Sequence, residues 1–291
     1  MMPYHETEGC LRKCPKFASE SLQSRFSCWG GYLYHLDVKT ALRGRQEGKK
    51  AMLGTLTVAE HEFNAYGLFA TDAGIYNAPE PDVQNIAIAG RSGDLIRLNN
   101  RYKNIPVRYP CVILSELASN LNMIKAYLLS DQNYVRIEDS FDSAHYREGR
   151  FIGGTEVHPT MDGTAASFDL EFDCKPQRWL TSGETVQTIA ASGDTLENPT
   201  LFSAKPLIKI TGSGAVTLTV GTYSLSISNI TDYINLDCET QDAYKTLAEN
   251  QNSRVTITQG DSFPVLMAGE NTVSWTGTVT KVEVTPRWWE L

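Results

Sequence analysis

Several protein classes are excluded by what the sequence of 291 residues lacks. It contains no run of 18 or more apolar residues, so we expect no membrane insertion. No apolar leader with a small-residue cleavage site stands at its start, which predicts a protein that stays in the cytoplasm until it is exported or assembled. Its net charge of −8 lacks the positive excess that phosphate binding requires, so we expect no specific nucleic-acid partner.

Motifs typical of enzymes are also missing. The chain has no Gly-x-Ser-x-Gly elbow, no His-Glu-x-x-His helix and no phosphate-binding glycine loop. Three carboxylates lie on one face of an alternating strand at residues 167–174, and we interpret them as a solvated strand face because no second carboxylate-bearing element accompanies them. We therefore predict no enzyme, no catalytic or cofactor-binding residues and no cofactor. The carboxylates are Asp169, Glu171 and Asp173. The histidines His61, His145 and His158 stand alone in the sequence, and a lone histidine is usually structural.

The six cysteines do not form a convincing metal site. Cys10 and Cys14 have a spacing that zinc ligands use, but no second close pair follows, so we predict no metal. The alternative is a zinc cluster of these two with Cys28, His5 and His35. The remaining cysteines, Cys111, Cys174 and Cys238, are isolated and are predicted to be buried thiols.

Residues 1–51 differ from the rest of the chain. They carry nine Lys or Arg against five Asp or Glu, a net charge of +4, whereas the remainder carries −12. Periodic apolar patterning begins only after Met52. We expect an extension of doubtful structure outside the working fold, with Met52 as the natural start; whether it is translated stays open. The competing interpretation is an arm that docks on a neighbour through Trp29, Tyr32 and Tyr34.

A long polar hairpin at residues 90–105 organises the first half. It lies between a strand-like run at Val83, Ile86 and Ile88 and a half-buried strand at residues 107–113. Having few apolar residues and several basic ones in an acidic chain, it is predicted to be an intersubunit arm that pairs with an acidic neighbour. Its predicted interface residues are Gly90, Arg91, Gly93, Arg97, Asn100, Arg101, Tyr102 and Lys103.

The other elements follow from local patterns. Apolar spacing predicts one helix at residues 116–129, with Ser115 as its N-cap. Residues 63–69 are expected to begin a strand-rich stretch and residues 76–82 to form a loop. Pro176 is expected to end the strand that begins near Ser167, because proline cannot donate to a ladder. A turn stabilised by side chains is predicted at Asp139, Ser140 and Asp142.

The second half contains short strand patterns at regular spacing, which is typical of a β-sandwich. Gly221-Thr222 between two alternating runs predicts a type II′ hairpin. We place a domain boundary at residues 181–183. The predicted organisation is mainly β, with α+β character in the first domain. The three parts are the extension 1–51, a domain 52–182 and a β-sandwich 183–291.

Separated motifs resemble the siphophage distal tail (Dit) protein family. They are AGRSGDL at 89–95, NNRYKNI at 99–105, YVRIEDS at 134–140 with YR at 146–147, FDCKPQR at 172–178, FPVL, GEN and W at 263–275, and PRWW at 286–289. The resemblance begins near Leu53 and extends to residue 291; residues 1–51 have no counterpart.

This resemblance implies a structural virion protein. A tail-tube-like β domain with one helix would form a ring, usually a hexamer, and a galectin-like β-sandwich would project outward. The ring would be a distal tail hub that joins the tail tube protein to tail-tip or baseplate proteins. It would be located at the distal end of the virion tail, after assembly in the host cytoplasm. Host, receptor and the choice between one ring and two back-to-back rings are not indicated.

A carbohydrate-binding module that recognises the host surface is the alternative, with a cell-surface glycan as partner. It depends on aromatic side chains that could form a sugar platform. The same side chains could equally be core or interface anchors, so both interpretations stay open. They are Trp275, Trp288 and Trp289, the predicted outer-domain contact.

Overall fold

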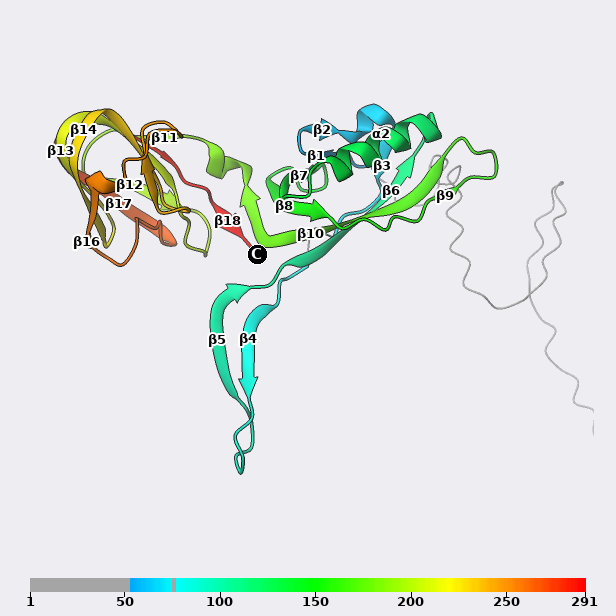
Figure 1. The fold of residues 1–291 in the computed structure, drawn as a ribbon, viewed down its shortest axis with the longest axis horizontal. Coiled ribbons are helices and arrows are strands. Elements are labelled where there is room, and N and C mark those ends of the chain that lie inside the picture. Colours follow the sequence, from blue (N-terminus) through cyan, green and yellow to red (C-terminus); the bar gives the residue numbers. More distant parts are fainter. Residues whose placement is uncertain (1–52, 75–76) are drawn as a thin grey trace, which may run out of the picture. The chain divides into compact units, whose positions relative to one another are not determined.

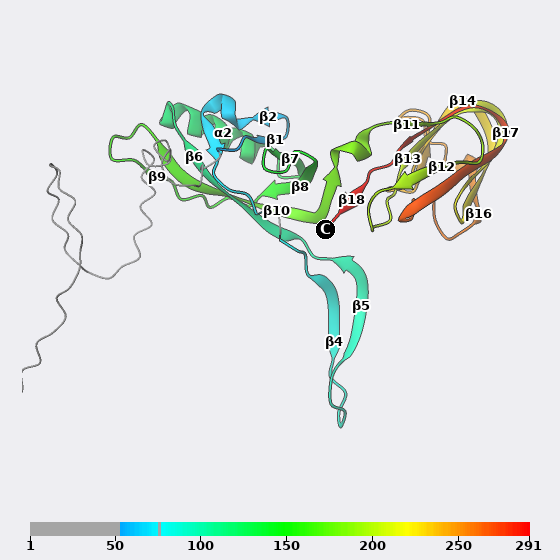
Figure 2. The same ribbon diagram turned by 180° about the vertical axis from the view of Figure 1, so that it is seen from behind.

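The computed structural model describes residues 53–74 and 77–291; the predictions for residues 1–51, including the zinc cluster, lie outside this part. The described chain is mainly β, with one α-helix, as predicted. It contains a nine-stranded sheet, a seven-stranded sheet and a two-stranded sheet, and all pairings between their strands are antiparallel (Figures 1 and 2).

The nine-stranded sheet has the order β2-β1-β7-β8-β10-β6-β3, and β9 and β18 also pair with β10. The helix α2, Leu117–Ser130, lies along one face of this sheet (Figure 1). Strand bounds are β1 Leu56–Val58, β2 His61–Glu62, β3 Leu68–Ala70, β6 Ile105–Ile113, β7 Val135–Asp139, β8 His145–Phe151, β9 His158–Pro159, β10 Ala166–Leu180 and β18 Trp289–Glu290.

Strands β6 and β10 carry the first core. Alternate residues of both strands are buried, from Val107 to Ile113 and from Phe168 to Cys174, as the alternation predicts. From α2, Ile124 and Leu128 complete this core. The opposite faces of the two strands are charged, and Arg108 contacts Asp169 there. The predicted solvated face of β10 is thus a set of surface ion pairs.

Three local predictions for this half are wrong. β10 does not end at Pro176 but continues to Leu180, because a register shift between Cys174 and Arg178 leaves the proline outside the ladder with β8. The cap residue of α2 is Glu116, with φ of 41°, and Ser115 makes no side-chain cap. Of the residues expected to begin a strand-rich stretch, Leu68 and Phe69 do lie in a strand, β3, but Phe63–Tyr66 form a 3₁₀-helix, η1.

The side-chain turn after β7 is confirmed. The Asp139 carboxylate accepts hydrogen bonds from the backbone N–H groups of Phe141 and Asp142, at 2.9 and 3.0 Å. The other Asp139 oxygen accepts a hydrogen bond from the buried Tyr109 hydroxyl at 3.0 Å, and the Ser140 hydroxyl accepts one from the Thr55 N–H. This turn therefore connects the first strand of the domain to its core.

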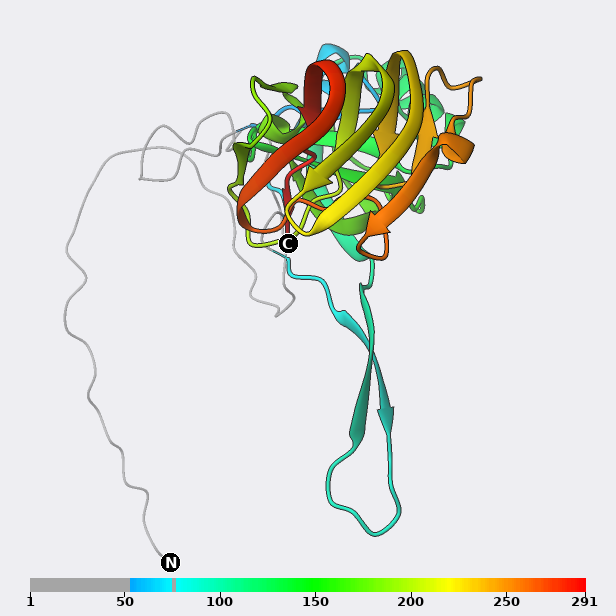
Figure 3. The same ribbon diagram turned by 90° about the vertical axis from the view of Figure 1, so that its left-hand side faces the viewer.

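The seven-stranded sheet surrounds a second, separate core. Its central strands are longer than the sequence patterns predict, since each pair of predicted short strands is one strand that continues through a bulge. They curve strongly (yellow to orange-red in Figure 3). Their bounds, with those of the shorter elements, are η2 Thr181–Glu184, β11 Gln187–Ile189, β12 Asp194–Asn198, β13 Leu207–Val220, β14 Tyr223–Asp237, β15 Asp242–Tyr244, η3 Asn252–Arg254, β16 Val255–Gln259 and β17 Gly269–Thr285.

The predicted hairpin at Gly221-Thr222 is confirmed, with Val220 paired to Tyr223 and a φ of 55° at the glycine. The 3₁₀-helix η2 lies at the predicted boundary; the buried residues of the first core precede it in sequence and those of the second core follow it. The domain limits 52–182 and 183–291 themselves stay predictions.

The segment after β17 joins both sheets. The Arg287 guanidinium donates two hydrogen bonds to the Asp237 carboxylate, at 2.7 and 3.0 Å. Trp288 is 2% exposed and belongs to the second core. Trp289 and Glu290 then form β18, which pairs with β10 of the first sheet.

We predict that Gly277 in β17 cannot be replaced. Its φ is 98°, and an added Cβ would lie 2.3 Å from the carbonyl oxygen of Ala215. Gly277→Ala should lower the free energy of unfolding by about 2–4 kcal/mol, from strain and overlap together. Gly269→Ala, with φ of 81° but open space around it, should cost only about 1–2 kcal/mol. Urea denaturation measures both; equal losses would contradict the bulge geometry.

We further predict a pH-dependent contribution from Asp237. The Arg287 guanidinium outweighs burial and lowers the pKa of this carboxyl. The contribution is therefore present above the unfolded-state pKa, about 3.9, and is lost as pH falls through the lower folded-state pKa. Asp237→Asn should cost about 2 kcal/mol at pH 7, from lost hydrogen bonds to a charged group. Below about pH 3 the difference from the unchanged protein should shrink; a constant difference would contradict the ion pair.

Candidate functional site

An exposed arm is the part of the described chain that stands apart from both cores. It consists of β4, Pro81–Ile86, and β5, Leu95–Tyr102, which form the two-stranded sheet (Figures 1 and 2). The prediction that residues 90–105 form the arm is corrected by this pairing, because β4 is half of the arm and pairs with β5, not with β6. We call residues 81–102 the arm.

Apolar side chains dominate one face of the arm. Val83 lies opposite Leu98, and Asn85 lies opposite Ile96, on the same face. Ile96 is 61% exposed and Leu98 is 63% exposed. Seven of the seventeen exposed large apolar side chains of the described residues lie in the arm: Val83, Ile86, Ile88, Leu95, Ile96, Leu98 and Tyr102.

This composition differs from the prediction of a polar arm. A two-stranded ribbon on its own is only marginally stable in water, since nothing covers its faces. No residue from 83 to 104 is buried against the rest of the described chain. A contiguous exposed apolar surface of this kind typically marks a protein–protein contact. The arm thus has the exposed apolar surface expected of one side of a protein–protein interface.

The charges of the arm pair within it. Arg101 contacts Asp82 at 2.6 Å, and Lys103, just after β5, contacts Glu80 at 3.3 Å. The Arg101 guanidinium lowers the pKa of the Asp82 carboxyl. Two of the predicted basic contacts to a neighbour are therefore already occupied inside the chain.

The tip of the arm holds the other predicted residues. Gly90 and Gly93 have φ of 76° and 87°, and nothing lies near either one. Arg91 and Arg97 are exposed and form no ion pair with any residue that the structure describes. Their guanidinium groups remain available to an acidic group of another molecule.

The base of the arm is fixed to the first sheet. The Asn104 side-chain amide donates hydrogen bonds to the Tyr134 hydroxyl at 2.5 Å and to the Asp173 carboxylate at 3.2 Å. Asn100 has φ of 53°, and the pairing shifts register before Tyr102, which lies opposite Pro81. The predicted residues of β5 therefore shape the ribbon where it joins the sheet.

The predicted tryptophan contact does not form one surface. Trp288 is buried, whereas Trp275 and Trp289 are half-buried. One ring face of Trp289 stacks on Phe202, with ring centroids 4.7 Å apart, and its indole N–H donates to the Ser203 carbonyl. The contact role of the three tryptophans stays a prediction, and core packing accounts for Trp288.

No group of three or more His, Cys, Asp or Glu side chains among the described residues could hold a metal ion. The predicted buried thiols are confirmed: Cys111, Cys174 and Cys238 are free and buried, and burial raises the pKa of Cys174 to about 12. No described helix is long and apolar enough to cross a membrane.

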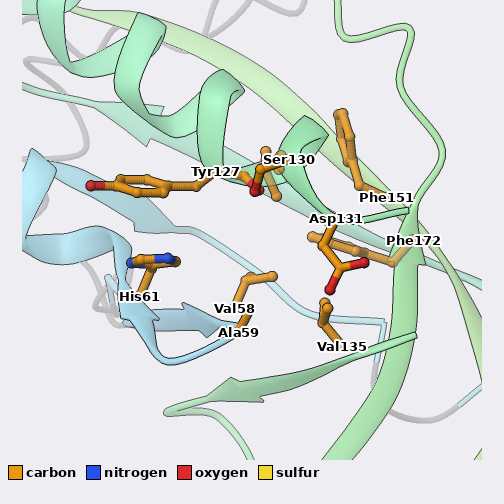
Figure 4. A pocket seen from close by; sticks show the side chains of 10 residues that line it. Val58, Ala59, His61, Tyr127, Ser130, Asp131, Val135, Phe151 and Phe172 are labelled. Carbon is orange, nitrogen blue, oxygen red and sulfur yellow. The ribbon is translucent and has the colours of Figure 1, made fainter. Parts of the chain in front are cut away.

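One small pocket opens between α2, β1 and β7 (Figure 4). His61 and Tyr127 stack at its side, with ring centroids 3.9 Å apart. Its volume of about 30 Å³ is far below that of small-molecule sites, which are roughly 300–1,000 Å³. Apolar carbon and aromatic rings line most of it, so it suits the end of a side chain better than a substrate.

Sequence reasoning missed the apolar character of the arm. The signal was present: Ile96 and Leu98 alternate with Arg97 as in a half-buried strand. The basic residues of the segment led to a prediction of a polar arm, because the charge of the whole segment does not show that Ile96 and Leu98 share a face that Arg97 does not.

Comparison with known proteins locates the fold. No protein-family model matches the chain, and no curated protein has a significant sequence match to it. Among solved structures, the SPP1 Dit protein, described as a paradigm of the hub adsorption apparatus in phages infecting Gram-positive bacteria, matches with a TM-score of 0.64 and 14% identity. That match covers 82% of this chain and 100% of the SPP1 protein.

Two baseplate structures of phage P2, in the activated conformation with calcium or strontium, also match. Their TM-scores are 0.45 and 0.43, with 9% and 10% identity; each match covers 80% of this chain and 98% of the other. The first match shows that the described chain has the Dit fold, so the resemblance is confirmed at the level of the fold.

We predict that the arm contributes little to the stability of its own chain. Arg101→Glu would place a like charge beside Asp82, yet should leave the urea midpoint nearly unchanged, because the Arg101 side chain is 75% exposed and no residue from 83 to 104 is buried. Arg97→Glu, at an arm arginine that is also exposed but forms no ion pair with any described residue, provides the matched charge control. Urea denaturation measures both. A loss of several kcal/mol for Arg101→Glu alone would mean that the arm packs on its own cores.

Proposed function

We propose that this protein is the distal tail hub of a siphophage, a structural ring subunit that joins the tail tube to tail-tip or baseplate proteins. The Dit fold supports the class of protein. The observation that carries the assembly role is the arm, whose apolar face has no partner within its own described chain.

The arm is the intersubunit element in this proposal. Burying an apolar side chain of the size of leucine contributes about 1.5–3 kcal/mol. Covering Val83, Ile96 and Leu98 therefore contributes a favourable free energy that offsets part of the cost of association. Arg91 at the tip and Arg97 in β5 add contacts to acidic groups, which the chain has in excess.

A closed homo-oligomer follows from such an arm. It is one patch that contacts a different patch on the next copy, and a head-to-tail contact closes into a ring when the rotation allows it. We propose six copies. The first domain forms the ring, and the second, galectin-like half faces outward to other tail proteins. The complete protein would lie at the distal end of the virion tail and would assemble in the host cytoplasm.

Glycan binding by the second half is the alternative function. It requires an exposed aromatic platform with polar groups beside it. Trp288 is buried and Trp289 is stacked on Phe202, which leaves Trp275 as the half-buried candidate of the set. No specific observation favours this alternative over a structural role.

We predict that Ile96→Ser with Leu98→Ser abolishes the ring and leaves a folded monomer. Both changed side chains are exposed in the single chain, so its folding should be unaffected. Size-exclusion chromatography with light scattering should report the mass of six or twelve chains for the unchanged protein and of one chain for the variant. The control is Leu201→Ser with Leu247→Ser, which removes two still more exposed leucines outside the arm and should retain the ring.

High salt distinguishes an arm contact made by charged side chains from one made by apolar side chains. At about 1 M salt the Debye length is roughly 3 Å, so a contact made of charges weakens. A contact through Ile96 and Leu98 should persist. Retention of the ring by the Ile96 and Leu98 variant, or a ring that dissociates in salt before any mutation, would contradict an apolar arm contact.

A further inference from the structure

A fully exposed methionine lies on a rigid turn at one end of the first sheet. Met161 follows β9 and is the most exposed large apolar side chain of the described residues. The turn is closed by hydrogen bonds from the Gly163 N–H to the Thr160 carbonyl at 2.9 Å and from the Thr160 N–H to the Ala165 carbonyl at 2.8 Å.

Side chains hold the same turn. The Thr160 hydroxyl contacts the Asp162 carboxylate at 2.6 Å, and these hydrogen bonds lower the pKa of Asp162 to about 2. The backbone that carries Met161 is therefore ordered, so presenting this side chain to a partner costs little conformational entropy beyond the side chain itself.

The pocket described above has the matching chemistry. Aromatic rings of Tyr127, Phe151 and Phe172 line it, together with Val58 and Val135, and Ser130 and Asp131 supply its polar part (Figure 4). A thioether makes favourable contacts with aromatic rings, and an unbranched side chain can enter a narrow opening. The volume of about 30 Å³ suits the end of one such side chain.

Met161 cannot reach the pocket of its own chain. Its turn leads into β10 at Ala166, whereas the pocket is built around Phe172, six residues farther along the same strand. At about 3.3 Å per residue the two lie roughly 20 Å apart. Figures 1 and 2 agree that β9 lies at one end of this sheet and β7 toward the other.

We propose that Met161 of one copy inserts into this pocket of the next copy. The occupant is a second copy of the chain because the proposed ring brings successive copies of this domain together, and β9 and the pocket lie toward opposite ends of its sheet. Two different patches that meet in this way give a head-to-tail contact, which closes into a ring. The inference rests on the proposed ring and adds a contact independent of the arm.

Disulfide crosslinking tests the contact directly. A double variant, Met161→Cys with Ser130→Cys at the pocket rim, is prepared in a chain whose Cys10, Cys14 and Cys28 are replaced by serine. The remaining thiols are buried, and burial raises the pKa of each, so they do not react at neutral pH. Mild oxidation should give a ladder of covalent multimers on a non-reducing gel.

Three controls make the result specific. Each single variant should give no covalent dimer, since a head-to-tail contact brings two different positions together. Met161→Cys with Met123→Cys, on the exposed side of α2, should also give none. In the otherwise unchanged chain, Met161→Ser should weaken association about tenfold or more, as expected for losing one buried methionine, while Met161→Leu should restore most of it.

The outcomes separate this contact from the ring itself. A ring by light scattering without a ladder would overturn the Met161 contact and leave the proposed function standing. A covalent dimer from either single variant would mean a symmetric contact and would also overturn it. A monomer without a ladder at working concentration would count against both proposals.

Discussion

The backbone ladder of β10 is the constraint on which the architecture depends. This strand of fifteen residues pairs with β6, β8, β9 and β18, so it organises the first sheet and receives the segment that follows the second core. Its continuity past Pro176 is possible because the register shifts there, which removes the need for a donor at the proline. If the strand ended at that point, β18 would have no partner, and Trp288 would lose the backbone that fixes it in the second core.

The arm and the Met161 turn are two solutions to the same physical problem. Each holds apolar side chains in water on a well-defined backbone, at a cost to the single chain that only association removes. The arm does so with a ribbon that lacks a covering layer, and the turn does so with one side chain on a tight set of hydrogen bonds. Association through both would bury surface that the described chain leaves exposed.

Sequence reasoning identified the elements but not their extent. The helix near Leu117, the buried alternation of β6 and β10 and the hairpin at Gly221 all follow from local periodicity, which backbone geometry determines directly. The length of β13, β14 and β17 does not follow, because a bulge interrupts the alternation without ending the strand. Likewise, pairing decides which face of the arm is apolar, and pairing with β4 was not predicted.

The position of β18 has a consequence for how the chain is made. Ribosomes synthesise a protein from its N-terminus, and domains that are continuous in sequence can fold while the rest is still emerging. Trp288 and β18 are synthesised after every other described strand, yet one completes the second core and the other pairs with β10. Neither sheet can therefore reach its final form before Trp289 and Glu290 have left the ribosomal tunnel.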